Sequence, residues 1–78
     1  MGPRHRYTIS TKHNLSQSLF KLRRYKEAAK LEQEVIEWRA EVLGSRHPET
    51  MSAKHSHVIT LRKLARHKEA DEIEQGMV

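Results

Sequence analysis

The chain of 78 residues repeats itself at a spacing of 42 residues, and this repeat limits its possible folds more than any other feature. When residues 5–36 are laid over residues 47–78 without a gap, 14 of the 32 aligned positions are identical. A period of about 20–50 residues is typical of supersecondary units that stack and bury a core only against their neighbours. The sequence therefore predicts a repeat protein, a class that usually presents a long surface to a partner rather than a catalytic pocket.

Apolar residues recur at helical spacing in both halves of the repeat and predict helices over residues 8–22, 26–43, 48–64 and 68–75. Gly44 suits the end of the second helix, where a left-handed residue is wanted. Pro48 suits the first turn of the third helix, where its missing N–H costs nothing. The second unit has no counterpart of residues 37–44. We therefore expect one all-α domain over residues 1–78, with antiparallel helix pairs in about 1.75 repeats: repeat 1 over 5–46 and a truncated repeat 2 over 47–78.

The apolar stripes also predict a core. Trp38 lies on such a stripe, so we expect it to pack rather than to bind a ligand. The glutamates at 32, 34, 37 and 41 accompany Lys30 and Arg39, so we expect them on a solvated helix face. The expected core residues are Leu15, Leu19, Leu22, Tyr25, Ala28, Leu31, Val35, Trp38, Leu61, Leu64 and Ala70.

The net charge of +5 alternates in sign along the chain. Residues 4–26 carry seven basic residues and no acid, whereas residues 69–75 carry four acids and no base. A chain that coats phosphate is not expected to compensate its cations in this way. The absence of cysteine excludes disulfides and a thiolate zinc site, and no apolar stretch approaches the ~20 residues of a membrane span. We expect a soluble, cytoplasmic protein without metal or cofactor.

Several short motifs occur at fixed places in the repeat unit, namely Asn14-Leu15, Leu19, Tyr25, Glu27-Ala28, Leu43-Gly44 and His47-Pro48-Glu49-Thr50. With these motifs the unit resembles the tetratricopeptide repeat family, in the form found in kinesin light chains and in long arrays on fungal signalling proteins. The resemblance implies four helices in a right-handed α-solenoid fragment. The chain departs from the family in the turn after the first helix, where Arg23 and Ala65 stand in place of the usual glycine.

The resemblance also implies that the first helix of each pair lines a concave groove that holds a peptide or a partner helix. Asparagine can donate to and accept from a peptide backbone, and lysine or arginine can pair with carboxylates. Because both helices are basic, we expect an acidic or phosphorylated segment. The alternative is that these side chains form ordinary solvated faces. The expected groove residues are His13, Asn14, Gln17, Lys21, His55, Ser56, Arg62 and Lys63, with Phe20 and Ile59 among further candidates.

No catalytic triad or HExxH motif occurs in the sequence, so we expect no enzyme. A protein–protein interaction or scaffold module is the leading hypothesis. Binding of nucleic acid by the two basic helices is the first alternative, which the charge alternation and the scarcity of groove aromatics disfavour. The third hypothesis is a self-associating fragment of a longer array, because three or more repeats are usually needed for stability.

Overall fold

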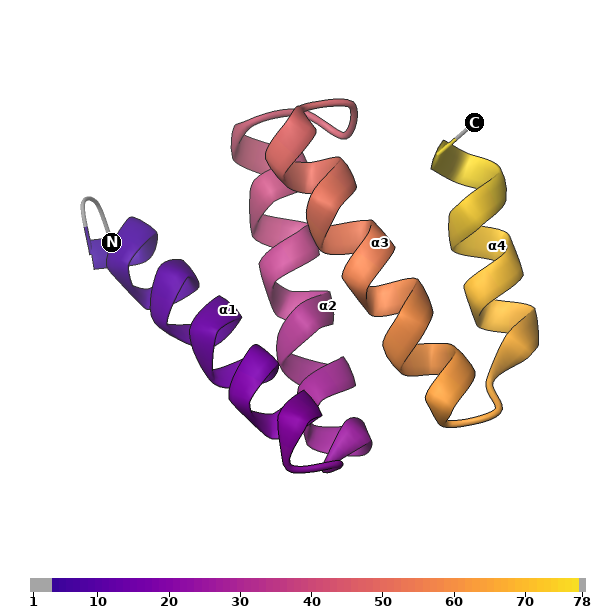
Figure 1. Ribbon diagram of the computed structural model, residues 1–78. Coiled ribbons are helices and arrows are strands. Elements are labelled where there is room, and N and C mark those ends of the chain that lie inside the picture. Colours follow the sequence, from indigo (N-terminus) through magenta and orange to yellow (C-terminus); the bar gives the residue numbers. More distant parts are fainter. Residues whose placement is uncertain (1–3, 78) are drawn as a thin grey trace.

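The computed structural model describes the backbone of residues 4–77 and the side chains of residues 8–76. Its four helices are α1 (Arg4–Lys21), α2 (Tyr25–Val42), α3 (Pro48–Lys63) and α4 (His67–Met77). Each helix packs on the next one along the chain, and α1 and α4 lie at opposite ends of a slab of 36 × 30 × 16 Å (Figure 1). The all-α prediction is confirmed, although α1 begins earlier than the predicted residue 8.

Helix α3 ends in a Schellman turn, in which two backbone N–H groups satisfy the last carbonyls of the helix. The N–H of Arg66 donates to the carbonyl of Leu61 at 2.8 Å, and the N–H of Ala65 donates to that of Arg62 at 3.0 Å. The same pair of bonds closes α1, 42 residues earlier. This turn needs one residue with left-handed backbone, and the φ angles are 61° at Ala65 and 63° at Arg23. This backbone conformation is the one that glycine adopts most readily, which accounts for the glycine that the resemblance implies at both places.

Replacing Ala65 with glycine is expected to raise the free energy of unfolding by up to about 1 kcal/mol. Left-handed backbone costs a residue with a Cβ about 1–2 kcal/mol, and the larger unfolded-state entropy of glycine cancels only part of that gain. The same substitution at Ala40, inside α2, is expected to lower the free energy of unfolding by about 1 kcal/mol. Urea unfolding followed by circular dichroism measures both changes. A loss of stability in Ala65→Gly would contradict the strain argument.

Two clusters of buried side chains hold the four helices together. Ile9, Val35 and Ala53 join α1, α2 and α3, with Trp38 packed against them. Val58, Leu61 and Ala70 join α3 to α4. Among the residues expected in the core, those that are buried are Leu19, Ala28, Val35, Leu61 and Ala70, and those that are half-buried are Tyr25, Leu31, Trp38 and Leu64.

Leu15 and Leu22 do not belong to the core. Their exposed fractions are 48% and 67%, so the prediction that they are buried is wrong. Helical spacing identifies an apolar side of a helix but does not say which neighbour covers it. Leu19 is buried, whereas Leu15 and Leu22 lie on a side of α1 that no helix of the described chain covers.

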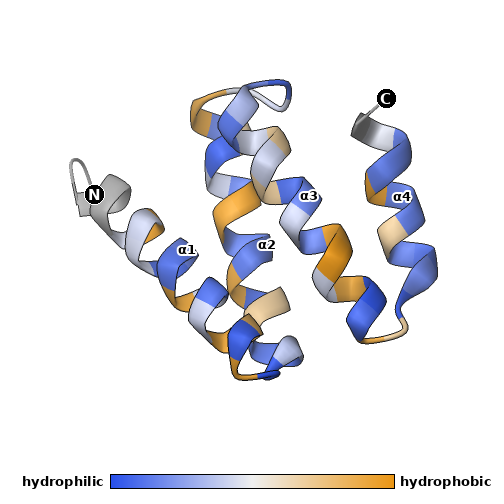
Figure 2. Ribbon diagram, in the orientation of Figure 1, coloured by the Kyte–Doolittle hydropathy of each residue, from blue (hydrophilic) through white to orange (hydrophobic). Residues whose placement is uncertain are grey.

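Colouring by hydropathy shows apolar residues interspersed with hydrophilic ones along α1, α2 and α3, while α4 is largely hydrophilic (Figure 2). Within residues 4–77, no helix is both long enough and apolar enough to cross a membrane.

Candidate functional site

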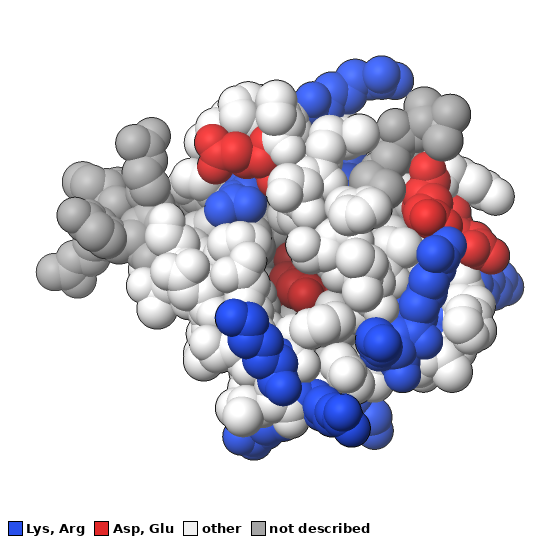
Figure 3. Space-filling model, in the orientation of Figure 1, with Lys and Arg blue, Asp and Glu red and all other residues white. Residues whose placement is uncertain are grey.

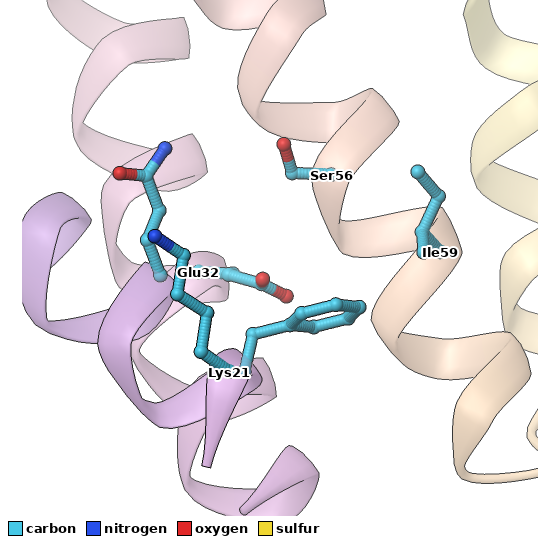
Figure 4. A pocket seen from close by; sticks show the side chains of 6 residues that line it. Lys21, Glu32, Ser56 and Ile59 are labelled. Carbon is cyan, nitrogen blue, oxygen red and sulfur yellow. The ribbon is translucent and has the colours of Figure 1, made fainter. Parts of the chain in front are cut away.

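A cavity of about 340 Å³ opens between α1 and α3. These two helices occupy equivalent positions in the repeat, and α2 lies behind the space between them (Figure 4). The cavity is lined by Gln17, Phe20 and Lys21 of α1, by Ser56 and Ile59 of α3, and by Glu32 of α2.

The cavity has an apolar part formed by Phe20 and Ile59. The Phe20 ring packs edge-on against the ring of Tyr25, with centroids 5.1 Å apart and planes at 70°, which restricts its orientation. Ile59 is 42% exposed on the opposite wall. A concave site with an apolar lining and a few polar groups is the usual form of a site for a small ligand or a side chain.

Glu32 forms the floor of the cavity and is only 6% exposed. Its Oε1 lies 3.0 Å from Nδ1 of His57, and the hydroxyl of Thr60 donates to its Oε2 at 2.8 Å. Both partners are buried on α3, so this carboxylate joins α2 to α3. A buried carboxylate needs such partners because burial without them is strongly unfavourable. The expectation that Glu32 is solvated is therefore wrong.

A signal in the sequence could have identified Glu32. It follows Ala28 by four residues and precedes Val35 by three, which places all three on one side of the helix. That side is buried, with Ala28 at 0% and Val35 at 1% exposure. The position of Glu32 on this side of α2 therefore indicates burial more strongly than its charge indicates exposure.

Basic side chains lie on one side of the cavity, near the C-terminal ends of α1 and α3 (Figure 3). Figure 3 shows Lys and Arg gathered over the C-terminal ends of α1 and α3, and a recessed acidic group between the helices. Arg62 is paired with Glu74 of α4, and Lys12 with Glu34 of α2. Among the described residues, Lys21 takes part in no ion pair, so its ammonium group is available at the rim.

His13 lies on α1 one turn before Gln17, with its Nε2 3.3 Å from Nε2 of Gln17. Burial lowers the pKa of His13 below its ordinary 6.5, the positive charge of Arg39 adds to this, and Glu32 opposes it. The ring is therefore predominantly neutral at pH 7 and can accept a hydrogen bond from the Gln17 amide.

The structure brings three of the eight expected groove residues into the cavity, namely Gln17, Lys21 and Ser56. The other expected residues do not line it: two lie nearer the N-terminus of α1 than the lining residues, and three lie on α3. The residues outside the lining are His13, Asn14, His55, Arg62 and Lys63.

Across the part of the chain that the structure describes, no three His, Asp or Glu side chains meet in a way that could hold a metal ion.

A family model described as a tetratricopeptide repeat matches residues 8–49, which is more than half of the chain. The chain belongs to the tetratricopeptide repeat family. Comparisons with curated proteins and with solved structures give no match. Tetratricopeptide repeats form protein–protein interaction surfaces, so a general role in interaction or scaffolding follows from the family.

The matched tetratricopeptide repeat covers the first helix pair and the linker to the second. His47 of this linker is the N-cap of α3, and its Nδ1 accepts a hydrogen bond from the N–H of Glu49 at 3.1 Å. Pro48 occupies the first helical position, where no N–H partner is needed. The His-Pro-Glu segment thus sets the start of α3, which supplies one wall of the cavity.

Proposed function

We propose that the concave face between α1 and α3 binds a peptide segment whose carboxylates lie at the rim while an apolar side chain enters the cavity. The observation that carries this proposal is the position of Lys21 beside Phe20, opposite Ile59, around one cavity. Helix α1 contains no acidic residue, and α3 contains only Glu49 in its first turn. The local charge therefore favours an acidic segment at the ends of these helices.

Glu32 makes the proposal more specific. Its carboxylate at the floor repels a second carboxylate, so the acids of the partner remain at the rim near Lys21. The deepest group of the partner is then an uncharged side chain that contacts Phe20 and Ile59. A peptide with one aliphatic or aromatic residue flanked by aspartate or glutamate has this chemistry.

The test is fluorescence anisotropy with short labelled peptides that carry one central leucine or phenylalanine flanked by glutamates. We expect Lys21→Glu to weaken binding of these peptides about tenfold, the equivalent of about 1.4 kcal/mol. Lys30→Glu is the matched control because it changes the same charge at an exposed position of α2 outside the cavity, and it should leave binding almost unchanged.

Peptides with lysine in place of each glutamate, duplex DNA and single-stranded RNA complete the experiment. We expect the lysine peptides to bind more weakly than the acidic ones. Equal loss of binding in Lys21→Glu and Lys30→Glu would contradict a role for the cavity. Nucleic-acid binding with a steep salt dependence and no binding of acidic peptides would instead support the nucleic-acid alternative.

A further inference from the structure

One side of α1 is exposed along three turns. Thr11, Leu15, Ser18 and Leu22 are all exposed, and their spacing of four, three and four residues places them in one line along the helix. We call these four residues the outer stripe. None of them lines the cavity between α1 and α3, so the outer stripe is a separate surface.

The equivalent residues of the second repeat are covered by α2. Adding 42 to each position gives Ala53, His57 and Thr60, which are 3%, 5% and 0% exposed, and Leu64, which is half-buried. His57 and Thr60 contact Glu32 of α2 directly. In this fold, therefore, the side of a first helix that corresponds to the outer stripe receives the second helix of the preceding repeat.

Helix α4 has the complementary free side at the other end of the chain. Ala29 of α2 is 4% exposed, whereas its repeat counterpart Asp71 is exposed. Glu32 is buried against α3, whereas the side chain of its counterpart Glu74 is 40% exposed. The side of α4 that corresponds to the α3-facing side of α2 is thus open.

We propose that α4 of one copy of the chain docks on the outer stripe of a second copy and repeats the α2–α3 contact between molecules. In this arrangement Glu74 lies opposite Ser18, as Glu32 lies opposite Thr60 within the chain. Helix α1 has no acidic residue, and α4 has four acids and only Lys68 as a base. Opposite charge favours α4 on α1, and like charge disfavours a symmetric pair of α1 helices. Such a head-to-tail contact adds copies end to end.

The test is sedimentation velocity of the full chain over a dilution series at low and at moderate salt. We expect an average mass that rises with concentration, more strongly at low salt because the contact is between opposite charges. Two variants should each weaken association about tenfold or more: Leu15→Glu with Leu22→Glu on the outer stripe, and Asp71→Lys with Glu74→Lys on α4. Val42→Glu is the control, since Val42 is 57% exposed on α2 and belongs to neither surface.

Mixing the two variants distinguishes the proposed contact from its alternatives. Each variant keeps one intact surface, so an equimolar mixture should form heterodimers at a concentration where neither variant associates alone. Circular dichroism of each variant shows whether the helices remain folded. A chain that stays monomeric at millimolar concentration would overturn the proposal. It would do so even if a synthetic peptide of residues 25–42, which corresponds to α2, bound to the outer stripe, because such binding would not show that α4 docks there. Association that survives in the α4 variant would also overturn it, because it would indicate a symmetric pair of α1 helices.

Discussion

Replacing Leu61 with alanine is expected to lower the free energy of unfolding by about 2–5 kcal/mol. Leu61 is 2% exposed and packs with Val58 and Ala70 between α3 and α4. Truncation removes buried apolar surface and leaves a cavity that the surrounding helices fill only in part. Because folded domains are stable by only about 5–15 kcal/mol, and short ones lie near the lower limit, this single change should unfold a large part of the population.

The matched control is Leu22→Ala, the same substitution at a position that is 67% exposed. It should change the free energy of unfolding by no more than about 0.5 kcal/mol. Thermal and urea unfolding of the two variants measure the difference at a protein concentration where the chain is monomeric. Similar losses for Leu61 and Leu22 would contradict the burial that separates these two leucines.

Replacing Glu32 with alanine is expected to lower the free energy of unfolding by about 1–3 kcal/mol. The change leaves Nδ1 of the buried His57 without its partner and removes one acceptor of the Thr60 hydroxyl, which keeps its bond to the carbonyl of Ser56. Glu32→Gln retains the shape and one acceptor oxygen, so it should recover a large part of the loss. Urea unfolding at fixed pH measures both variants.

Glu74→Ala is the control for Glu32→Ala because Glu74 occupies the same place in the second repeat. Its carboxylate pairs with Arg62 at the surface, where such pairs contribute about 0–1 kcal/mol. Equal losses of stability in the two alanine variants would contradict the role of Glu32, with His57 and Thr60, in joining α2 to α3.

The helices could be predicted from sequence because their signals are local. Gly44 ends α2 with a φ of 99°, and Pro48 begins α3, as the residue types at these positions indicate. The identical turns at Arg23 and Ala65 follow from the repeat itself, since equivalent residues adopt equivalent backbone. Local periodicity and caps therefore carried most of the information about the fold.

The burial of individual side chains is harder to predict from sequence, because it depends on which helices are neighbours. Leu15 and His57 occupy equivalent positions, yet the leucine is 48% exposed and the histidine 5% exposed. The reason is that α2 covers α3 and no described helix covers the same side of α1. Glu32 shows the converse case, in which a charged residue is buried because His57 and Thr60 provide hydrogen bonds from the next repeat.

The candidate site could be predicted in part. The resemblance to the tetratricopeptide repeat implies that Gln17, Lys21 and Ser56 lie on the concave sides of their helices, and all three line the cavity. The pairing of Arg62 with Glu74 depends on α4 and could not be inferred from the charge of α3 alone. The residues at the rim of the site can thus be predicted from their place in the repeat. The contacts that fix the shape of the site depend on how the helices pack.

The most direct test of the proposed binding site is a chemical-shift map of the ¹⁵N-labelled chain during titration with an acidic peptide that contains one leucine. We expect the largest shifts on the backbone amides of the residues that line the cavity, namely Gln17, Phe20, Lys21, Ser56 and Ile59. The peptide concentration that gives half of the full shift should rise about tenfold in Lys21→Glu and stay almost unchanged in Lys30→Glu. Shifts centred on the outer stripe or on α4, with the amides around the cavity unchanged, would contradict the proposed binding site.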